Sequence, residues 1–124
     1  MIWTRGEKIN YIDLNGSILK FDIEREKDSL IKLFGNNADL KISELNNLLL
    51  KKEKTLISIN SIYYQTNIGW QIIFHNNKCV FLPLKKLEKV LDIFQDITNT
   101  ELYNQFNFFD IRVFRRIYMS NKKC

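Results

Sequence analysis

The sequence predicts an α+β domain with an antiparallel sheet built from hairpins, two helices on one face and a long C-terminal edge strand. Two pairs of β-prone runs each flank a short turn, Asn15-Gly16 in the first and Asn76-Asn77 in the second. Two other stretches repeat apolar residues at helical spacing. The last stretch, FNFFDIRVFRRIYM, is almost unbroken β-forming sequence.

Length and composition indicate a single globular domain. The chain has 124 residues, of which 45% are hydrophobic and 27% charged, so it can bury a core without help from disulfides or metal ions. Its formal net charge of +5 permits an acidic protein partner, a nucleic acid or an anionic membrane surface. The chain is also rich in Ile, Asn and Lys, a bias that AT-rich codons produce. The charge alone therefore identifies no partner.

The N-terminal part is predicted to begin with a hairpin. In KINYIDLNGSILKF, Asn15-Gly16 separates two β-prone runs, and both central residues of a type I′ turn need positive φ. The charged run DIEREKDS at residues 22–29 is then expected to be a connector. LIKLFG follows as a short apolar run closed by Gly35.

Two amphipathic helices are predicted, one before and one after a group of strands in the sequence. In residues 36–52, Asn37 or Asp39 can cap the first turn, and the apolar stripe consists of Ile42, Leu45, Leu48 and Leu49. In residues 84–97, which follow Pro83, the apolar face consists of Leu84, Leu87, Leu91 and Phe94.

The strands between these helices form a second predicted hairpin and its neighbour. Residues 55–66 are expected to be a strand, and the shift in apolar alternation between Ile59 and Ile62 indicates a bulge. Residues 69–83 are expected to fold back at Asn76-Asn77, because Asn tolerates the left-handed conformation of a tight turn.

The last predicted strand has two different faces, because alternate residues of a strand share a face. The core face is expected to carry Phe109, Ile111, Val113, Ile117 and Met119, with Arg115 as an interruption. The opposite face carries Phe106, Phe108, Asp110, Arg112, Phe114, Arg116 and Tyr118. Aromatic and arginine side chains are enriched at interface hot spots. The residues leave two interpretations open: a central strand covered on both faces, or an exposed strand to which a partner adds its own strand.

The sequence predicts no catalytic, metal or cofactor site. His75 is the one histidine, and it lies at a tight turn with no acid or nucleophile beside it. The two cysteines, Cys79 in an apolar strand and Cys124 at the chain end, have neither zinc spacing nor the pattern of a disulfide framework. We therefore expect a buried Cys79, a mobile Cys124 and a protein that is not an enzyme.

A small basic nucleic-acid-binding domain is the alternative interpretation. The run IRVFRRIYM places basic residues beside aromatics, as in platforms on which bases stack. Elsewhere the lysines are interleaved with acids instead of being gathered in one region. The sequence is also expected to hold neither a transmembrane segment nor a signal peptide.

Five stretches, taken in order, match the pattern of one known family: IWTRGEKINYIDLNGSIL, LIKLFGNNA, GWQIIFHNNKCVFLP, KKLEKVLDIF and FFDIRV. They resemble a tryptophan-led hairpin, a short strand before a helix, a second hairpin, the helix after it, and an I-D-L-R signature at the start of a last strand. These are features of the membrane-distal β domain of the FtsQ/DivIB family of bacterial cell-division proteins. The resemblance runs from Ile2 to about Ser120, so residues 1–120 are expected to be this β domain and residues 121–124 a flexible basic tail.

The resemblance implies a non-catalytic scaffold of septal cell division, without a small-molecule substrate. Family members are inner-membrane proteins with a cytoplasmic tail, one transmembrane helix, a POTRA domain and this β domain in the periplasm. The first three parts are absent from these 124 residues, so Met1 is expected to lie within a longer gene or to begin a separate fragment.

The resemblance also implies partners within the division machinery, the divisome. The family's last strand binds the division protein FtsB, itself paired with FtsL, by strand addition. Transferred onto this sequence, the partner-binding residues are Arg112, Val113, Arg115, Arg116, Ile117, Tyr118, Met119 and Ser120. Phe109, Asp110 and Ile111 are expected to anchor the strand.

Overall fold

The structure is a computed structural model that describes the backbone of residues 2–5, 8–12, 18–19, 31–52, 58–113 and 116–124, and the side chains from residue 31 onward within these ranges. Nine strands and three helices are described. In chain order they are β1 (Ile2–Arg5), β2 (Lys8–Ile12), β3 (Ile18–Leu19), β4 (Lys32–Phe34), α1 (Ala38–Leu50), β5 (Ile59–Gln65), β6 (Gly69–Phe74), β7 (Cys79–Pro83), α3 (Leu87–Thr98), α4 (Glu101–Gln105), β8 (Phe108–Asp110) and β9 (Tyr118–Ser120).

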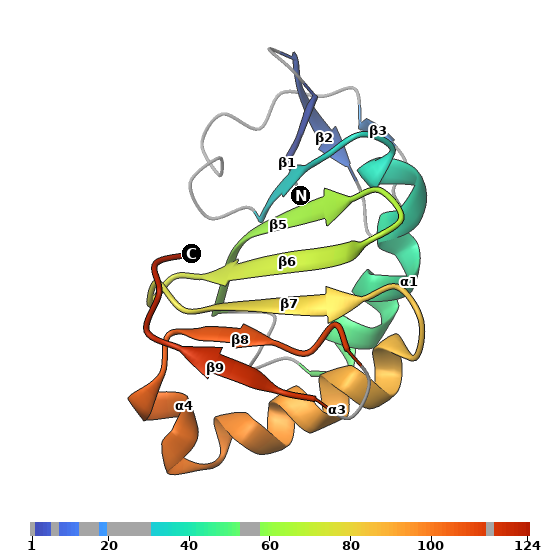
Figure 1. The fold of residues 1–124 in the computed structure, drawn as a ribbon. Helices are drawn as coiled ribbons and strands as arrows, with labels where there is room; N and C mark the ends of the chain where they lie inside the picture. The colour runs from blue at the N-terminus through green and yellow to red at the C-terminus, as the bar shows by residue number, and fades with distance from the viewer. Residues whose placement is uncertain (1, 6–7, 13–17, 20–30, 53–57, 114–115) are drawn as a thin grey trace.

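The nine described strands form one sheet in the order β3-β2-β1-β4-β5-β6-β7-β8-β9 (Figure 1). The predicted α+β class is confirmed. The expected antiparallel arrangement holds for most pairs, but β1–β4, β4–β5 and β7–β8 are parallel. The chain passes through α1 between β4 and β5, and through α3 and α4 between β7 and β8. A helical crossover of this kind lets adjacent strands run in the same direction, so the sheet is mixed.

Both predicted helices pack on one face of the sheet, where they bury the core (Figure 1). Leu33 of β4, Ile72 of β6 and Val80 of β7 are fully buried. They belong to the same cluster as Leu45 of α1 and Phe94 of α3. Burial of this apolar surface is the main force that holds helices and sheet together.

No described helix covers the opposite side of the sheet, which we call the open face. The strand register places one row of side chains across it, because paired residues in adjacent strands point to the same side. From β4 to β9 this row consists of Phe34, Tyr63, Gln71, Phe81, Asp110 and Tyr118. The rings of Phe34 and Tyr63 stack at the β4–β5 end of the row, 4.6 Å apart.

The local predictions for the hairpins and the bulge agree with the structure. β6 and β7 pair in an antiparallel hairpin, and Asn77 in its turn has a φ of 67°. β5 has a register shift between Ile59 and Ser61, where the bulge was predicted. β2 and β3 pair in an antiparallel arrangement, while the turn at Asn15-Gly16 lies outside the described residues. Asn37 is the N-cap residue of α1, but its side chain makes no capping hydrogen bond.

The C-terminal strand differs from the prediction. The chain was expected to form one long edge strand, but it forms β8 and β9, which pair antiparallel to each other. The side chain of Asp110 explains the break, since its Oδ1 accepts a hydrogen bond from the backbone N–H of Arg112, 3.1 Å away. This Asx-type contact turns the backbone out of the strand conformation. The edge of the sheet is therefore the short strand β9, which begins at Tyr118.

Candidate docking edge

β9 is the last strand in the sheet, and among the described strands it pairs with β8 alone. An edge strand leaves a row of backbone N–H and C=O groups without a strand partner. Tyr118 at the start of β9 is 51% exposed, and Met119 and Ser120 are half-buried. β9 therefore offers an accessible edge to another chain.

The connection from β8 to β9 places exposed apolar and basic side chains next to this edge. Val113 is 61% exposed, Ile117 is 42% exposed, and Arg116 is also exposed. The backbone N–H of Arg116 donates to the carbonyl oxygen of Val113, 3.0 Å away. Val113 and Ile117 were expected on the core face, but neither belongs to a described strand and both are exposed to solvent. Arg115 lies outside the described residues.

The residues before the break fix β8 to the core. Phe109 is completely buried and Ile111 is 3% exposed. The ring centroid of Phe109 lies 5.8 Å from that of Phe94 in α3 and 5.8 Å from that of Tyr103 in α4. Met119 of β9, the partner of Phe109 in the register, packs against the same core. β8 and β9 are thus anchored from the helical side of the sheet.

Asp110 and Arg112 form a two-pronged ion pair at the end of β8. Nε of Arg112 donates to Oδ1 of Asp110 at 2.9 Å, and Nη2 donates to Oδ2 at 2.6 Å. Burial raises the pKa of Asp110, but hydrogen bonds and charge from Arg112, with the charge of Lys122, outweigh it and hold the pKa below its ordinary value. The Asp110 hydrogen bond in turn raises the pKa of Arg112. The two residues, which the sequence places on one face of the last strand, thus pair directly where β8 ends.

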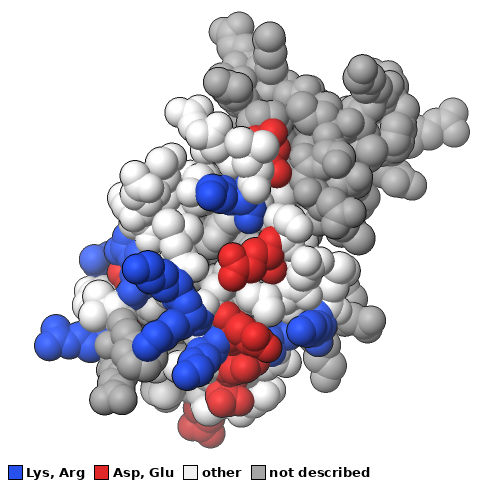
Figure 2. Space-filling view, turned by 90° about the vertical axis from the view of Figure 1, so that its right-hand side faces the viewer, with Lys and Arg blue, Asp and Glu red and all other residues white. Residues whose placement is uncertain are grey.

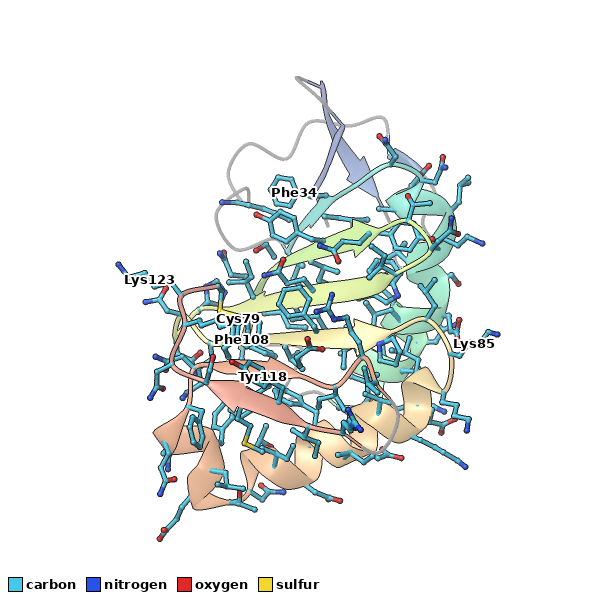
Figure 3. All side chains as sticks on the ribbon, in the orientation of Figure 1. Phe34, Cys79, Lys85, Phe108, Tyr118 and Lys123 are labelled. Carbon is cyan, nitrogen blue, oxygen red and sulfur yellow. A yellow bond between two sulfur atoms is a disulfide. The ribbon has the colours of Figure 1, made fainter. Side chains whose placement is uncertain are left out.

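A cluster of rings and cations covers the open face from β7 to β9. We call it the ring cluster; it consists of Phe81, Phe108, Tyr118, Arg112 and Lys122. Phe108 contacts Phe81 and Tyr118, with centroid distances of 5.2 Å and 6.1 Å. Cζ of Arg112 lies 4.6 Å from the Phe81 centroid, and Nζ of Lys122 lies 5.4 Å and 5.1 Å from those of Phe108 and Tyr118. These cation–π contacts join β9 laterally to β8 and β7. Figure 3 shows Phe108 and Tyr118 on the side of the sheet that faces the viewer.

Lys78, which the sequence argument did not identify, holds the junction between α4 and β8. Its Nζ donates to the carbonyl oxygens of Tyr103 and Phe106, the second at 2.7 Å, and lies 4.7 Å from the Tyr103 ring centroid. A cation suits the carbonyl end of a helix. Burial lowers the pKa of Lys78. No local pattern indicated this role, because the contact joins residues 25 and 28 positions apart.

The two cysteines form a disulfide with each other, a pairing that the sequence did not predict. Cys79 and Cys124 are joined with a Cα–Cα distance of 6.0 Å across 45 positions of sequence. Cys79 is fully buried, as predicted, whereas Cys124 is exposed. The pairing was not visible in the sequence because two cysteines give no spacing pattern to read. The flexibility expected for residues 121–124 stays a prediction, but the end of this tail is tied to β7.

Other kinds of site find little support in the described part of the chain. No group of three or more His, Cys, Asp or Glu side chains there could hold a metal ion. Among the same residues, no helix has the length and apolar character needed to cross a bilayer. Figure 2 shows Lys and Arg side chains beside Asp and Glu on the side of the molecule that carries α1 and the start of α3. Lys52, after α1, and Asp92 of α3 form an ion pair, with Nζ and Oδ1 2.7 Å apart.

Comparison with known proteins identifies the family. The family model described as cell division protein FtsQ/DivIB, C-terminal, matches residues 1–112, which is most of the chain. The match includes β1 to β8 and ends at Arg112, so β9 follows it. No curated protein matches the chain. The long family match and the agreement of the fold with the expected order of elements lead to one conclusion: this chain belongs to the FtsQ/DivIB family of cell division proteins, through the family's C-terminal domain.

Proposed function

We propose that this domain is a non-catalytic scaffold of the divisome that binds FtsB, together with its partner FtsL, by strand addition to β9. Membership of the family gives the role in cell division. The accessible edge of β9 supports the finer proposal, because a partner strand can satisfy its unpaired backbone groups. In the full-length protein the domain would lie in the periplasm, attached to the inner membrane by segments outside these residues.

The side chains around β9 suit a partner that continues beyond the added strand. Val113, Ile117 and Tyr118 together expose apolar surface beside the edge. Arg116 and Lys122 surround it with positive charge. Exposed apolar surface bounded by charged side chains is typical of protein interaction sites. We propose that the backbone of β9 supplies the pairing and that these side chains select the partner.

Strand addition can be tested on the partner's backbone. A strand uses alternate N–H groups to pair with one neighbour. Synthetic peptides covering the periplasmic segment of FtsB from the same bacterium would carry N-methyl groups at successive positions, and their binding would be measured by calorimetry. We expect an alternating profile, in which methylation at every second residue abolishes binding and methylation between them is tolerated. If the effect of N-methylation on binding did not alternate along the peptide, strand addition would be excluded, and the contact would have to be made by side chains.

Surface variants test the location of the site. Ile117→Asp places a charge in the exposed apolar surface beside β9 and should weaken FtsB binding at least about tenfold. Leu40→Asp is the matched control, because Leu40 is 72% exposed on α1, on the helical side of the sheet. Equal binding by the wild type and Ile117→Asp, with both proteins folded, would place the interaction elsewhere.

A further inference from the structure

β9 has little support from the sheet itself. It has three residues and a single described neighbour, and strand pairs this short are marginal in water. On the helical side only Met119 reaches the core. On the open face β9 is held by the ring contact of Tyr118 with Phe108 and by the contacts that Lys122 makes with both rings. Because Lys122 lies after Ser120, whatever holds the residues after Ser120 adds to the ordering of β9.

The chain after β9 returns across the open face of the sheet. Cys79, Phe108 and Ser120 form one row of the register from β7 through β8 to β9. The chain leaves this row at Ser120 and comes back to it at Cys124, which is bonded to Cys79 two strands away. Residues 121–124, which we call the C-terminal strap, therefore pass over β8. Figure 1 shows this segment turning from the end of β9 toward the β6–β7 turn.

We propose that the Cys79–Cys124 disulfide holds the C-terminal strap over β8 and thereby orders β9 as a docking edge, so that docking depends on the oxidation state of this bond. The docking part of this inference rests on the proposed function, whereas the ordering of β9 does not. Removing the bond frees the strap, and Lys122 then loses its fixed position over the two rings. β9 would separate from β8 for part of the time, and a partner would bind only the fraction of molecules in which β9 is formed.

The position of the bond allows reduction without unfolding. Cys124 is exposed, and a cavity of about 410 Å³ beside it is lined by Ile73, Asn77, Asn107, Lys122 and Lys123. A thiolate of a dithiol reductant can attack the Sγ of Cys124, which releases Cys79 as a thiolate that takes up a proton. The second thiol of the reductant then displaces Cys124, so that the reductant becomes a disulfide and the protein gains two thiols. Cys79 lies outside the main core cluster, so this cluster keeps its packing.

Hydrogen exchange would test the ordering of β9 directly. The oxidised protein, the protein reduced with excess dithiothreitol, and the variant Cys124→Ser would be compared by NMR. We expect those backbone amides of residues 118–120 that donate to β8 to lose at least about tenfold protection in the reduced protein and in the variant. The amides of Ile72 and Val80, in the central strands, should keep theirs. Lys123→Ala is the control for changing the strap without removing the bond. Equal protection of β9 in all four samples would overturn the inference.

Binding of the periplasmic segment of FtsB to the same samples separates the two proposals. Tight binding to the oxidised protein, with at least about tenfold weaker binding after reduction, supports both. Equal binding to the oxidised and reduced forms overturns the dependence on oxidation and leaves the proposed function intact. Binding to neither form overturns the proposed function, and the hydrogen-exchange result alone then decides whether the disulfide orders β9.

Discussion

Arg112 holds the carboxylate of Asp110 with two side-chain hydrogen bonds while its own backbone N–H donates to the same carboxylate. The guanidinium also lies over the ring of Phe81 in the neighbouring strand. One ion pair therefore ends β8, directs the chain into the connection to β9 and attaches that connection to the open face.

Arg112→Ala should raise the pKa of Asp110 and reduce stability above about pH 4. The pKa of Asp110 in the folded protein lies below its ordinary value. The ion pair therefore stabilises the fold fully at pH values above the unfolded pKa, which is near 4. This stabilisation disappears as the pH falls through the folded pKa. Because both side chains are partly exposed, the loss is about 0.5–1 kcal/mol at neutral pH. NMR titration of the Asp110 carboxyl and urea unfolding from pH 3 to pH 7 measure the two effects. A difference between variant and wild type that stays constant down to pH 3 would contradict this account.

Phe109→Ala should destabilise the domain much more than Ile117→Ala, although both residues were expected on one strand face. Phe109 is completely buried against Phe94 and Tyr103, so removing its ring leaves a cavity and lowers the free energy of unfolding by about 3–5 kcal/mol. Ile117 is 42% exposed in the connection, and its truncation should change stability by less than about 0.5 kcal/mol. Urea unfolding of both variants gives the comparison. Similar losses would mean that Ile117 packs into the core.

Lys78→Met should lower the free energy of unfolding by about 1–2 kcal/mol, because the carbonyl oxygens of Tyr103 and Phe106 lose their donor. Methionine keeps most of the apolar volume, so the change reports mainly the lost charge and hydrogen bonds. Lys85→Met is the matched control, since Lys85 is exposed and should tolerate the change within about 0.5 kcal/mol. Denaturant unfolding and hydrogen exchange at Asn107 measure the effect, and unchanged values for Lys78→Met would remove its role at the α4–β8 junction.

Gly69→Ala should destabilise the domain by at least about 2 kcal/mol. Gly69 has a φ of 151°, and a Cβ there would lie 2.0 Å from the carbonyl oxygen of Leu82 in the paired strand. Asn67→Gly is the opposite case, because Asn67 has a positive φ of 62°, a conformation that glycine adopts more readily than asparagine. That variant should be as stable as the wild type or slightly more stable. Thermal unfolding of the two variants tests the pair, and a fully stable Gly69→Ala would show that the β6–β7 register can shift.

Much of the fold could be predicted because its signals are local. The apolar periodicity of residues 36–52 and 84–97 predicts two helices, and the turn at Asn76-Asn77 predicts the hairpin of β6 and β7. Each of these signals depends on residues a few positions apart. The alternation around Phe109 also predicted its burial correctly. The C-terminal segment lies at an edge of the sheet, as predicted, but its division into β8 and β9 was not predicted.

The break after Asp110 shows why the shape was missed. Residues 111–117 contain neither Gly nor Pro, so the sequence carries none of the usual signs of a turn. The turn includes a contact between the Asp110 side chain and Arg112, and the same two residues would also share one face of a continuous strand. Alternation alone therefore placed Val113 and Ile117 on a core face that the chain has already left.

By itself the sequence determined the α+β class, the hairpins, the two helices and most of the core, because turn chemistry and apolar periodicity act over neighbouring residues. Only the tertiary structure decided which strands run parallel, where the last strand folds back, how Lys78 holds the α4–β8 junction and that Cys124 is bonded to Cys79. These features join residues that are far apart in the chain, or choose between two local arrangements that the same residues allow. They form only where helix packing brings the segments together. The position of β9 at the sheet edge therefore depends on the tertiary structure and cannot be deduced from residues 118–120 alone.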